Sequence, residues 1–155
     1  MKGIKKVIDA LNAALADELG AVNQYMVHAE MCENWGYEKL HDAIKKRAIE
    51  EMKHAETLIA RLLFLEGNPV VSKLSPIHIG GTVPKIMDYD LEAELGAVKL
   101  YNGFVKLCVE AGDKGSAEVF DHLLQDEERH LDWLEAQKDQ IAQMTLPNYL
   151  ATQAR

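Results

Sequence analysis

Four glutamates and two histidines are the residues of this chain whose types and spacing best suit metal chemistry: Glu18, Glu51, His54, Glu94, Glu127 and His130. Each histidine follows a glutamate by three positions, and residues so spaced lie on one face of a helix and can chelate one ion together. A shift of 76 positions carries the first Glu-x-x-His motif onto the second, and Glu18 onto Glu94. Two such motifs with one further glutamate each are the ligand pattern of di-iron and di-manganese carboxylate sites. Carboxylate oxygen and imidazole nitrogen suit ferrous iron and its neighbours rather than copper(I).

Charge favours a metal site over a merely structural polar core. Four buried carboxylates without cations would each cost several kcal/mol and would repel one another. Two divalent ions would neutralise them. A third Glu-x-x-His, Glu38 to His41, has Lys and Ala at the shifted positions 114 and 117, and Glu38 lies off the core face. We interpret this third occurrence as chance.

The elements that must position these ligands follow from the prolines, which stand only at 69, 76, 84 and 147. The two proline-free stretches are rich in helix-forming residues, and each divides once at a glycine-containing turn. The sequence therefore predicts four long helices at about 4–34, 37–65, 84–111 and 115–144. Pro147 can open a short fifth helix over residues 148–153.

The connection between the second and third helices, residues 66–83, is the only long one. At roughly 3.3 Å per residue its 18 residues can reach about 60 Å, and a helix of about 28 residues is only about 42 Å long. The connection can therefore return along the whole bundle and leave these two helices parallel. The prediction is an all-α, ferritin-like four-helix bundle with one long crossover and a short C-terminal fifth helix.

The 76-residue shift relates two helical hairpins, about 4–65 and 84–144, within a single domain of residues 1–155. It also aligns residues 18–25 with 94–101, and Cys32 with Cys108. At 100° per residue the ligands lie in the middle of apolar stripes, so we expect them to point into the core. On the first helix that stripe comprises Ile4, Val7, Leu11, Leu15, Val22, Tyr25, Ala29 and Cys32. We expect both cysteines to be buried thiols, and the histidines without a repeat partner, His28, His41, His78 and His122, to lie at the surface.

Composition excludes several classes of function. The chain has 155 residues, 48% of them hydrophobic, and a net charge of −8, so it is not expected to bind nucleic acid or anionic lipid through its overall field. It has no apolar run of membrane-spanning length. Its first residues lack the apolar h-region and the small-residue cleavage site of a secretory signal, so none is expected. Two cysteines do not make a disulfide framework, and a reducing cytoplasm is the expected location.

Over its whole length the sequence resembles the bacterioferritin family. The resemblance is carried by the opening MKGIKKVIDALN, residues 18–25, EMKHAE at 51–56, LFLEG at 63–67, DEERH at 126–130 with DWLE at 132–135, and NYL at 148–150. It implies a cage of 24 subunits, built from twofold dimers, that holds an iron mineral. Co-assembly with a second subunit type stays open.

The resemblance also implies a ferroxidase centre in each bundle. Glu18, Glu51 and His54 would hold one iron, and the second set would be Glu94, Glu127 and His130. The glutamates at 51 and 127 would bridge both ions. Fe(II) would be oxidised by O2 or H2O2, and a small ferredoxin is a possible electron donor for release. Tyr25 is a candidate for a supporting role beside the ligands, although an ordinary core tyrosine is an equal alternative.

Met52 is implied to ligate a b-type haem together with its twofold mate, one haem per subunit dimer. It lies off the core face, near Ala48, Ile59 and Leu63, and the first helix carries a comparable stripe of Leu19, Asn23 and Met26. A second apolar stripe on an acidic surface indicates an isologous dimer interface. Two features depart from the family. Lys46 stands beside Glu50 where members often have a histidine of an accessory iron site, and Lys45 and Met26 stand where an aromatic residue often lies near the haem.

Two other functions compete with iron storage. A stand-alone di-iron oxidase or peroxidase of the rubrerythrin type would use the same bundle chemistry, but the chain has no Cys-x-x-Cys pair for a rubredoxin-like iron. A DNA-protecting mini-ferritin is disfavoured because the ligands lie within one bundle and no basic tail is present. Particle size separates the first alternative from a storage cage.

Overall fold

The computed structural model describes residues 1–154, and within that range all regular secondary structure is helical. The helices are α1 (Lys5–Asn34), α2 (Glu38–Phe64), α3 (Val83–Glu110), α4 (Lys114–Met144) and α5 (Leu146–Gln153). The ends of the four long helices fall within one residue of the prediction, and α5 begins two residues earlier. None of these helices, as far as residue 154, is long and apolar enough to cross a bilayer.

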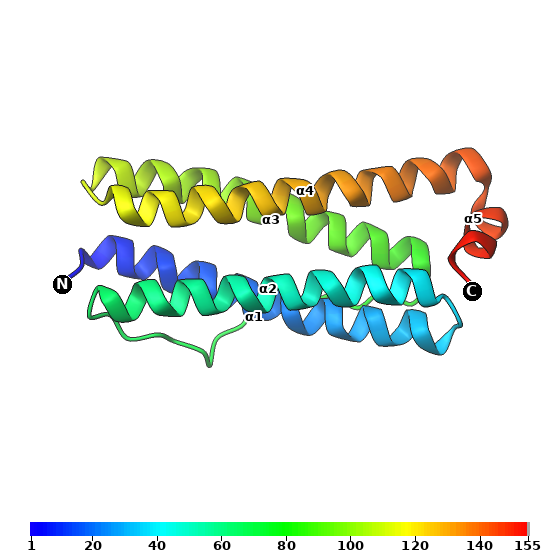
Figure 1. The fold of residues 1–155 in the computed structure, drawn as a ribbon, viewed down its shortest axis with the longest axis horizontal. Helices are drawn as coiled ribbons and strands as arrows, with labels where there is room; N and C mark the ends of the chain where they lie inside the picture. The colour runs from blue at the N-terminus through cyan, green and yellow to red at the C-terminus, as the bar shows by residue number, and fades with distance from the viewer. Residues whose placement is uncertain (155) are drawn as a thin grey trace.

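Figure 1 shows two antiparallel hairpins, α1–α2 and α3–α4, stacked side by side. The segment 65–82 carries no helix or strand and runs back along the bundle from the end of α2 to the start of α3 (Figure 1). As a result α2 and α3 are parallel, and α5 folds across the far end, near the C-terminus. The ferritin-like bundle with one long crossover is confirmed.

Local chemistry defines the helix ends. Gly36 and Gly112, related by the 76-residue shift, have φ of +85° and +80° after α1 and α3, a conformation that glycine adopts without steric cost. Asp113 caps α4 by accepting the backbone N–H of Ser116 at 2.9 Å, and Thr82 caps α3. The two hairpin turns therefore share their glycine, whereas Tyr37, at the position equivalent to Asp113, makes no side-chain cap hydrogen bond to α2.

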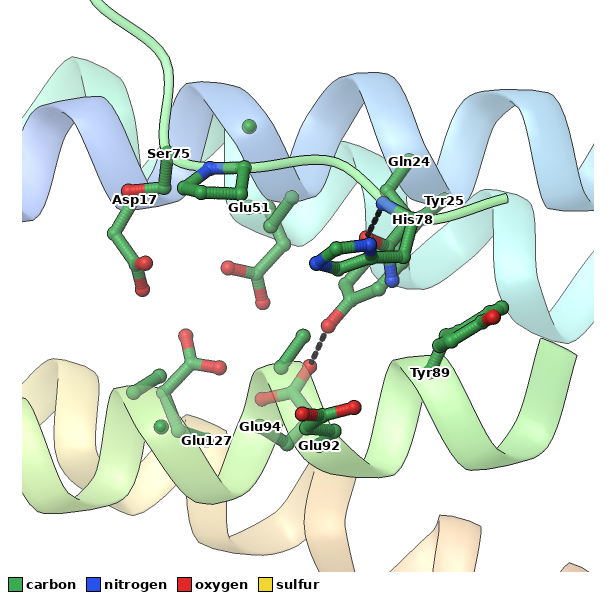
Figure 2. Close-up of a pocket in the computed structure, with 16 residues that line it drawn as sticks. Asp17, Gln24, Tyr25, Glu51, Ser75, His78, Tyr89, Glu92, Glu94 and Glu127 are labelled. Atoms are coloured by element: carbon green, nitrogen blue, oxygen red, sulfur yellow. Dashed lines mark hydrogen bonds between the residues drawn. The ribbon is translucent and has the colours of Figure 1, made fainter. Parts of the chain in front are cut away.

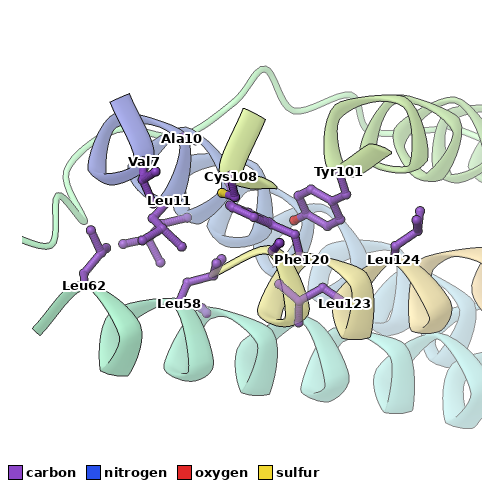
Figure 3. Close-up of a cluster of buried hydrophobic side chains, with 14 of the residues drawn as sticks. Val7, Ala10, Leu11, Leu58, Leu62, Tyr101, Cys108, Phe120, Leu123 and Leu124 are labelled. Carbon is purple, nitrogen blue, oxygen red and sulfur yellow. The ribbon is translucent and has the colours of Figure 1, made fainter. Parts of the chain in front are cut away.

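The bundle core has two parts, one on each side of the six candidate metal ligands. The part nearer the N-terminus contains Val7, Leu11, Leu58, Leu62 and Phe120 (Figure 3), and the part nearer the C-terminus contains Tyr25, Ile44, Met87, Leu134 and Tyr149. Cys32 and Cys108 are buried free thiols, as predicted. Ile4 was predicted to face the core but is 41% exposed, because it precedes the first turn of α1.

The prediction of surface positions was wrong for two of the four unpaired histidines. His28 is fully buried and His41 is 8% exposed, because each finds a polar partner inside the bundle. His28 Nδ1 lies 2.7 Å from Asp90 Oδ1, and His41 Nδ1 lies 2.9 Å from the carbonyl oxygen of Ala29. His78 and His122 are exposed, as predicted.

Candidate metal centre

The structure brings the six predicted ligands together midway along the bundle, with every long helix contributing at least one. All six are at most 5% exposed. They form two overlapping groups in which the candidate ligand atoms lie within 4.8 Å of one another: Glu18, Glu51, His54 and Glu127, and Glu51, Glu94, Glu127 and His130. Glu51 and Glu127 belong to both groups, which is the arrangement that two bridging carboxylates require.

The Nδ1 atoms of the two histidines occupy equivalent places. His54 Nδ1 lies 2.9 Å from Glu127 Oε1 and 3.5 Å from Glu18 Oε2. His130 Nδ1 lies 3.0 Å from Glu51 Oε1 and 3.4 Å from Glu94 Oε1. Each histidine is thus nearest to the shared glutamate of the other hairpin, and the two rings stack with centroids 6.3 Å apart. The centre has the pseudo-twofold symmetry that the sequence repeat predicts.

All six side chains carry a buried polar atom without a hydrogen-bond partner. These atoms are Glu18 Oε2, Glu51 Oε1, His54 Nδ1, Glu94 Oε2, Glu127 Oε1 and His130 Nδ1. Buried polar atoms are rarely left unpaired, and unpaired charges are costlier still. Oxygen and imidazole nitrogen converging on one space suit a pair of divalent ions of the iron type. The residues present therefore fit a dinuclear metal centre.

The pKa values of these side chains are shifted because several ionisable groups are buried close together. Burial and the neighbouring Glu127 carboxylate raise the pKa of Glu94 to about 8. Burial and Glu51 raise the pKa of Glu18 well above its ordinary value. Burial opposes the charged form of His130, but the surrounding carboxylates, Glu127 first, raise its pKa to about 12. A metal ion that bound here would have to displace protons from these groups.

Each histidine is held from behind by a further carboxylate. His54 Nε2 lies 2.8 Å from Asp126 Oδ2, and His130 Nε2 lies 2.5 Å from Glu50 Oε2. Arg129 links the two carboxylates, with Nη2 2.6 Å from Asp126 and Nη1 3.5 Å from Glu50. Such partners fix the tautomer and orientation of a ligating imidazole. Sequence reasoning missed Asp126, although the 76-residue shift carries Glu50 onto it.

Two tyrosines hold the terminal glutamates, Glu18 and Glu94, which each belong to only one ligand group. Each tyrosine contacts the glutamate of the other hairpin. Tyr25 donates its hydroxyl hydrogen to Glu94 Oε1 at 2.7 Å, and Tyr101 donates to Glu18 Oε1. Each tyrosine therefore orients the ligand of the opposite hairpin and leaves its other oxygen for the centre. The sequence pointed to Tyr25 only, although the repeat aligns Tyr101 with it.

A pocket of about 210 Å³ leads from the surface to the ligands between α1 and α3. Glu51, Glu94 and Glu127 lie at its inner end, and the crossover residues Ser75 and His78 lie along one side (Figure 2). Further lining residues are Asp17, Tyr89 and Glu92. Small side chains at positions 20, 21, 93, 96 and 97 keep the passage open. This pocket is the candidate route by which ions and small molecules would reach the ligands.

Met52 lies outside the bundle core, as its helical position predicts. It is 47% exposed, and Ile49 and Leu63 on the same helix are 41% and 60% exposed. On α1, Met26 and Val27 are 51% and 40% exposed. An accessible thioether on an apolar face is compatible with a soft axial ligand at an interface between two copies.

Comparisons with known proteins agree with this architecture. The family model for a ferritin-like domain matches residues 8–144. The chain is 44% identical over 149 residues to a bacterioferritin of Brucella melitensis, covering 96% of this chain and 92% of the relative. It is 47% identical over 137 residues to one of Rhodobacter capsulatus, covering 88% and 85%.

A solved 2.6 Å structure of Rhodobacter capsulatus bacterioferritin, described as having a metal-free dinuclear site and a haem iron in a crystallographic special position, superposes with a TM-score of 0.99. That chain is 42% identical to this one, and the match covers 100% of this chain and 97% of the other. The chain belongs to the bacterioferritin family of ferritin-like proteins.

Proposed function

We propose that this chain stores iron and that its dinuclear centre is a ferroxidase, oxidising Fe(II) to Fe(III) with O2 or H2O2 as the electron acceptor. The observation that carries the proposal is the pair of overlapping ligand groups, in which all six side chains direct an unpartnered buried atom to one space. Bacterioferritin relatives of high identity support the storage role.

The six ligands would hold two substrate ions. Glu18 and His54 would hold one Fe(II), Glu94 and His130 the other, and the shared glutamates at 51 and 127 both. Four carboxylates balance the charge of two ferrous ions. The carboxylates of Asp17 and Glu92 would attract Fe(II) to the pocket.

Glu127→Ala tests the ferroxidase because Glu127 belongs to both ligand groups. We expect fast oxidation of the first two Fe(II) per chain, followed by stopped-flow absorbance, to fall by at least 100-fold. The matched control is Glu128→Ala, which removes an exposed glutamate one position away and should leave the rate unchanged. Rapid oxidation that persists in Glu127→Ala would exclude this centre as the ferroxidase.

Storage also requires a large assembly, which we propose is a cage of 24 subunits built from twofold dimers. The test is aerobic loading with a large excess of Fe(II), then size-exclusion chromatography with iron analysis of each fraction. Iron far above two per chain should elute with a particle much larger than one 17.4 kDa chain. Uptake that stops near two irons on a small species would instead indicate a stand-alone di-iron oxidase of the rubrerythrin type.

We also propose that Met52 is an axial ligand of a b-type haem shared between two copies of the chain. Bound haem would supply a redox-active iron at the interface, and Met52 with its neighbouring apolar side chains would hold it. Met52→Leu should yield protein without the haem Soret absorption. Met26→Leu, which changes a methionine on α1 in the same apolar face, should retain that absorption. Stoichiometric haem in Met52→Leu would exclude this ligand. The electron donor for iron release, for which a small ferredoxin is the candidate, would be sought by reducing such haem-loaded cages.

A further inference from the structure

Side chains beside the turn between α1 and α2 form a second group of possible metal ligands. The group lies about three helical turns along α1 and α2 from the dinuclear centre. Glu30 and Glu33 belong to the end of α1, and His41 belongs to the first turn of α2. One ligand atom of each lies within 4.8 Å of the other two. We propose that these three residues bind a divalent cation of the Zn2+ or Fe2+ class, independently of the ferroxidase centre.

His41 is the feature that distinguishes this group from an ordinary acidic patch. The residue is only 8% exposed, and its Nδ1 lies 2.9 Å from the carbonyl oxygen of Ala29. A carbonyl oxygen can only accept a hydrogen bond, so Nδ1 must carry the ring hydrogen. The lone pair of the neutral ring is therefore on Nε2, which lies 3.6 Å from Glu33 Oε2.

The geometry of the three groups suits an ion between them. Zinc binds imidazole nitrogen and carboxylate oxygen at about 2.0–2.2 Å, so neighbouring ligands of a tetrahedral ion stand about 3.4 Å apart. The 3.6 Å separation of His41 Nε2 and Glu33 Oε2 matches that spacing. Glu33 and Glu30 are exposed, and their side chains can close on an ion without disturbing the core. Three protein ligands leave a fourth position for water.

The surroundings also favour a cation. Glu33 lies in the last turn of α1, at the negative end of the helix dipole, and that turn contains no basic residue. A bound cation would offset both the dipole and the repulsion between the two carboxylates. The 76-residue shift places Lys106, Val109 and Ala117 at the equivalent positions. The group is therefore not a by-product of the repeat that built the dinuclear centre.

Zinc is a suitable probe because it is redox-inert. Metal-free protein would be equilibrated with Zn2+ by dialysis, and the zinc bound per chain measured for the wild type, Glu33→Gln and His41→Asn. Asparagine retains a donor for the Ala29 carbonyl and removes Nε2. Each variant should bind one zinc fewer per chain. The control Glu118→Gln, at an exposed position on α4, should bind as many as the wild type.

The two metal sites are separable by repeating the titration in Glu127→Ala. There the dinuclear centre is disabled, and the zinc lost on adding Glu33→Gln reports only the turn site. Anomalous diffraction at the zinc edge from crystals of the intact protein should place a peak between His41 Nε2 and Glu33. Equal zinc counts in the wild type and Glu33→Gln, with no peak at the turn, would overturn the proposal and leave a simple His41–Glu33 ion pair.

Discussion

The two ends of the bundle differ sharply although the hairpins that form them are repeats of one another. At the end nearer the N-terminus, Tyr101 packs against Phe120 with ring centroids 5.8 Å apart, in an apolar core. At the other end, the guanidinium of Arg47 lies over the equivalent Tyr25, with Arg47 Cζ 4.2 Å from the centroid of the tyrosine ring. The environment of the terminal glutamates is thus apolar behind Glu18 and charged behind Glu94.

A buried polar network occupies the charged end. Arg47 Nη2 lies 2.5 Å from Asp90 Oδ2, and Asp90 Oδ1 also contacts His28 at 2.7 Å and Gln24 at 2.9 Å. The 76-residue shift relates these four residues only to apolar ones: Leu123, Ala14, Phe104 and Leu100. The repeat is therefore kept in the ligand layer but not at these four buried polar positions.

The crossover explains why only one end carries this network. The backbone N–H of Gly80 donates to His28 Nε2 at 2.9 Å, and that of His78 donates to Gln24 Oε1 at 3.0 Å. The crossover arrives at this end just before α3 and has no counterpart in the second hairpin. The crossover backbone needs polar partners where it packs against the bundle, and at this end His28 and Gln24 supply them. Metal ligation would require symmetry in the centre, whereas chain connectivity breaks symmetry around it.

Asp90→Ala should produce the largest effect, because it leaves the charge of Arg47 buried and unpaired. Arg47 is 4% exposed and Asp90 is fully buried. We expect the free energy of unfolding of the metal-free chain, measured in urea, to fall by about 3–5 kcal/mol. The double variant Arg47→Leu/Asp90→Ala, which imitates the apolar end, should recover much of that loss. A loss below about 1 kcal/mol in Asp90→Ala would show that the network does not stabilise the fold.

Two acidic residues one turn apart on α3 should respond to pH in opposite ways. The pKa of Glu94 is raised to about 8 by burial and by Glu127. The contribution of Glu94 to the free energy of unfolding is therefore fully present below its ordinary pKa of 4.5. That contribution is lost as the pH rises toward 8. Burial opposes the charge of Asp90, but Arg47 and His28 hold its pKa below the ordinary 3.8. The contribution of Asp90 is thus present above that value and lost only as the pH falls through its lower folded pKa.

Urea unfolding of metal-free protein between pH 5 and pH 8 separates these two behaviours. Glu94→Gln should become more stable relative to the wild type as the pH rises, by on the order of a few kcal/mol. Asp90→Asn should stay less stable by a constant amount across the same range. Parallel pH profiles for all three proteins would contradict the assignment of charge states at this end of the centre.

The tyrosine pair offers a matched test of the two environments. Tyr25→Phe and Tyr101→Phe each remove one hydrogen bond to a terminal glutamate, which costs about 1–3 kcal/mol when the acceptor is buried. Tyr101→Phe should weaken Co2+ binding, followed by its visible absorption, more than Tyr25→Phe does. The reason is that Arg47, which lies over the Tyr25 ring with Nε and Nη1 unpartnered, still interacts electrostatically with Glu94. The equivalent neighbour of Tyr101 is the apolar ring of Phe120. Equal losses would mean that Arg47 does not act on the centre.

Much of the centre was predictable because it follows local rules. Helical periodicity placed the six ligands on inward faces, and the prolines and glycines fixed the helix ends. The repeat alone would also have identified Tyr101 and Asp126. Periodicity could not find the Arg47–Asp90 pair, which joins residues 43 positions apart and has no repeat partner. For the same reason His28 and His41 read as surface residues: their buried partners come from other helices.

The smallest expected effect comes from two glycines that the repeat aligns, Gly20 and Gly96. A Cβ on Gly96 would meet no atom within 4 Å, whereas one on Gly20 would lie 3.0 Å from the carbonyl oxygen of Ser75 in the crossover. Gly96→Ala should therefore raise the free energy of unfolding by about 0.5–1 kcal/mol through helix propensity.

Gly20→Ala should not raise the free energy of unfolding in the same urea experiment, because the new methyl group would press on the backbone of Ser75. A hydrogen bond of 3.0 Å from Ser75 N–H to the Ala16 carbonyl oxygen holds that backbone against α1. If both substitutions stabilised the protein equally, the crossover would be free to move away from α1. The difference between the two ends would then come from the buried network alone. Close backbone contact would not hold the crossover against α1.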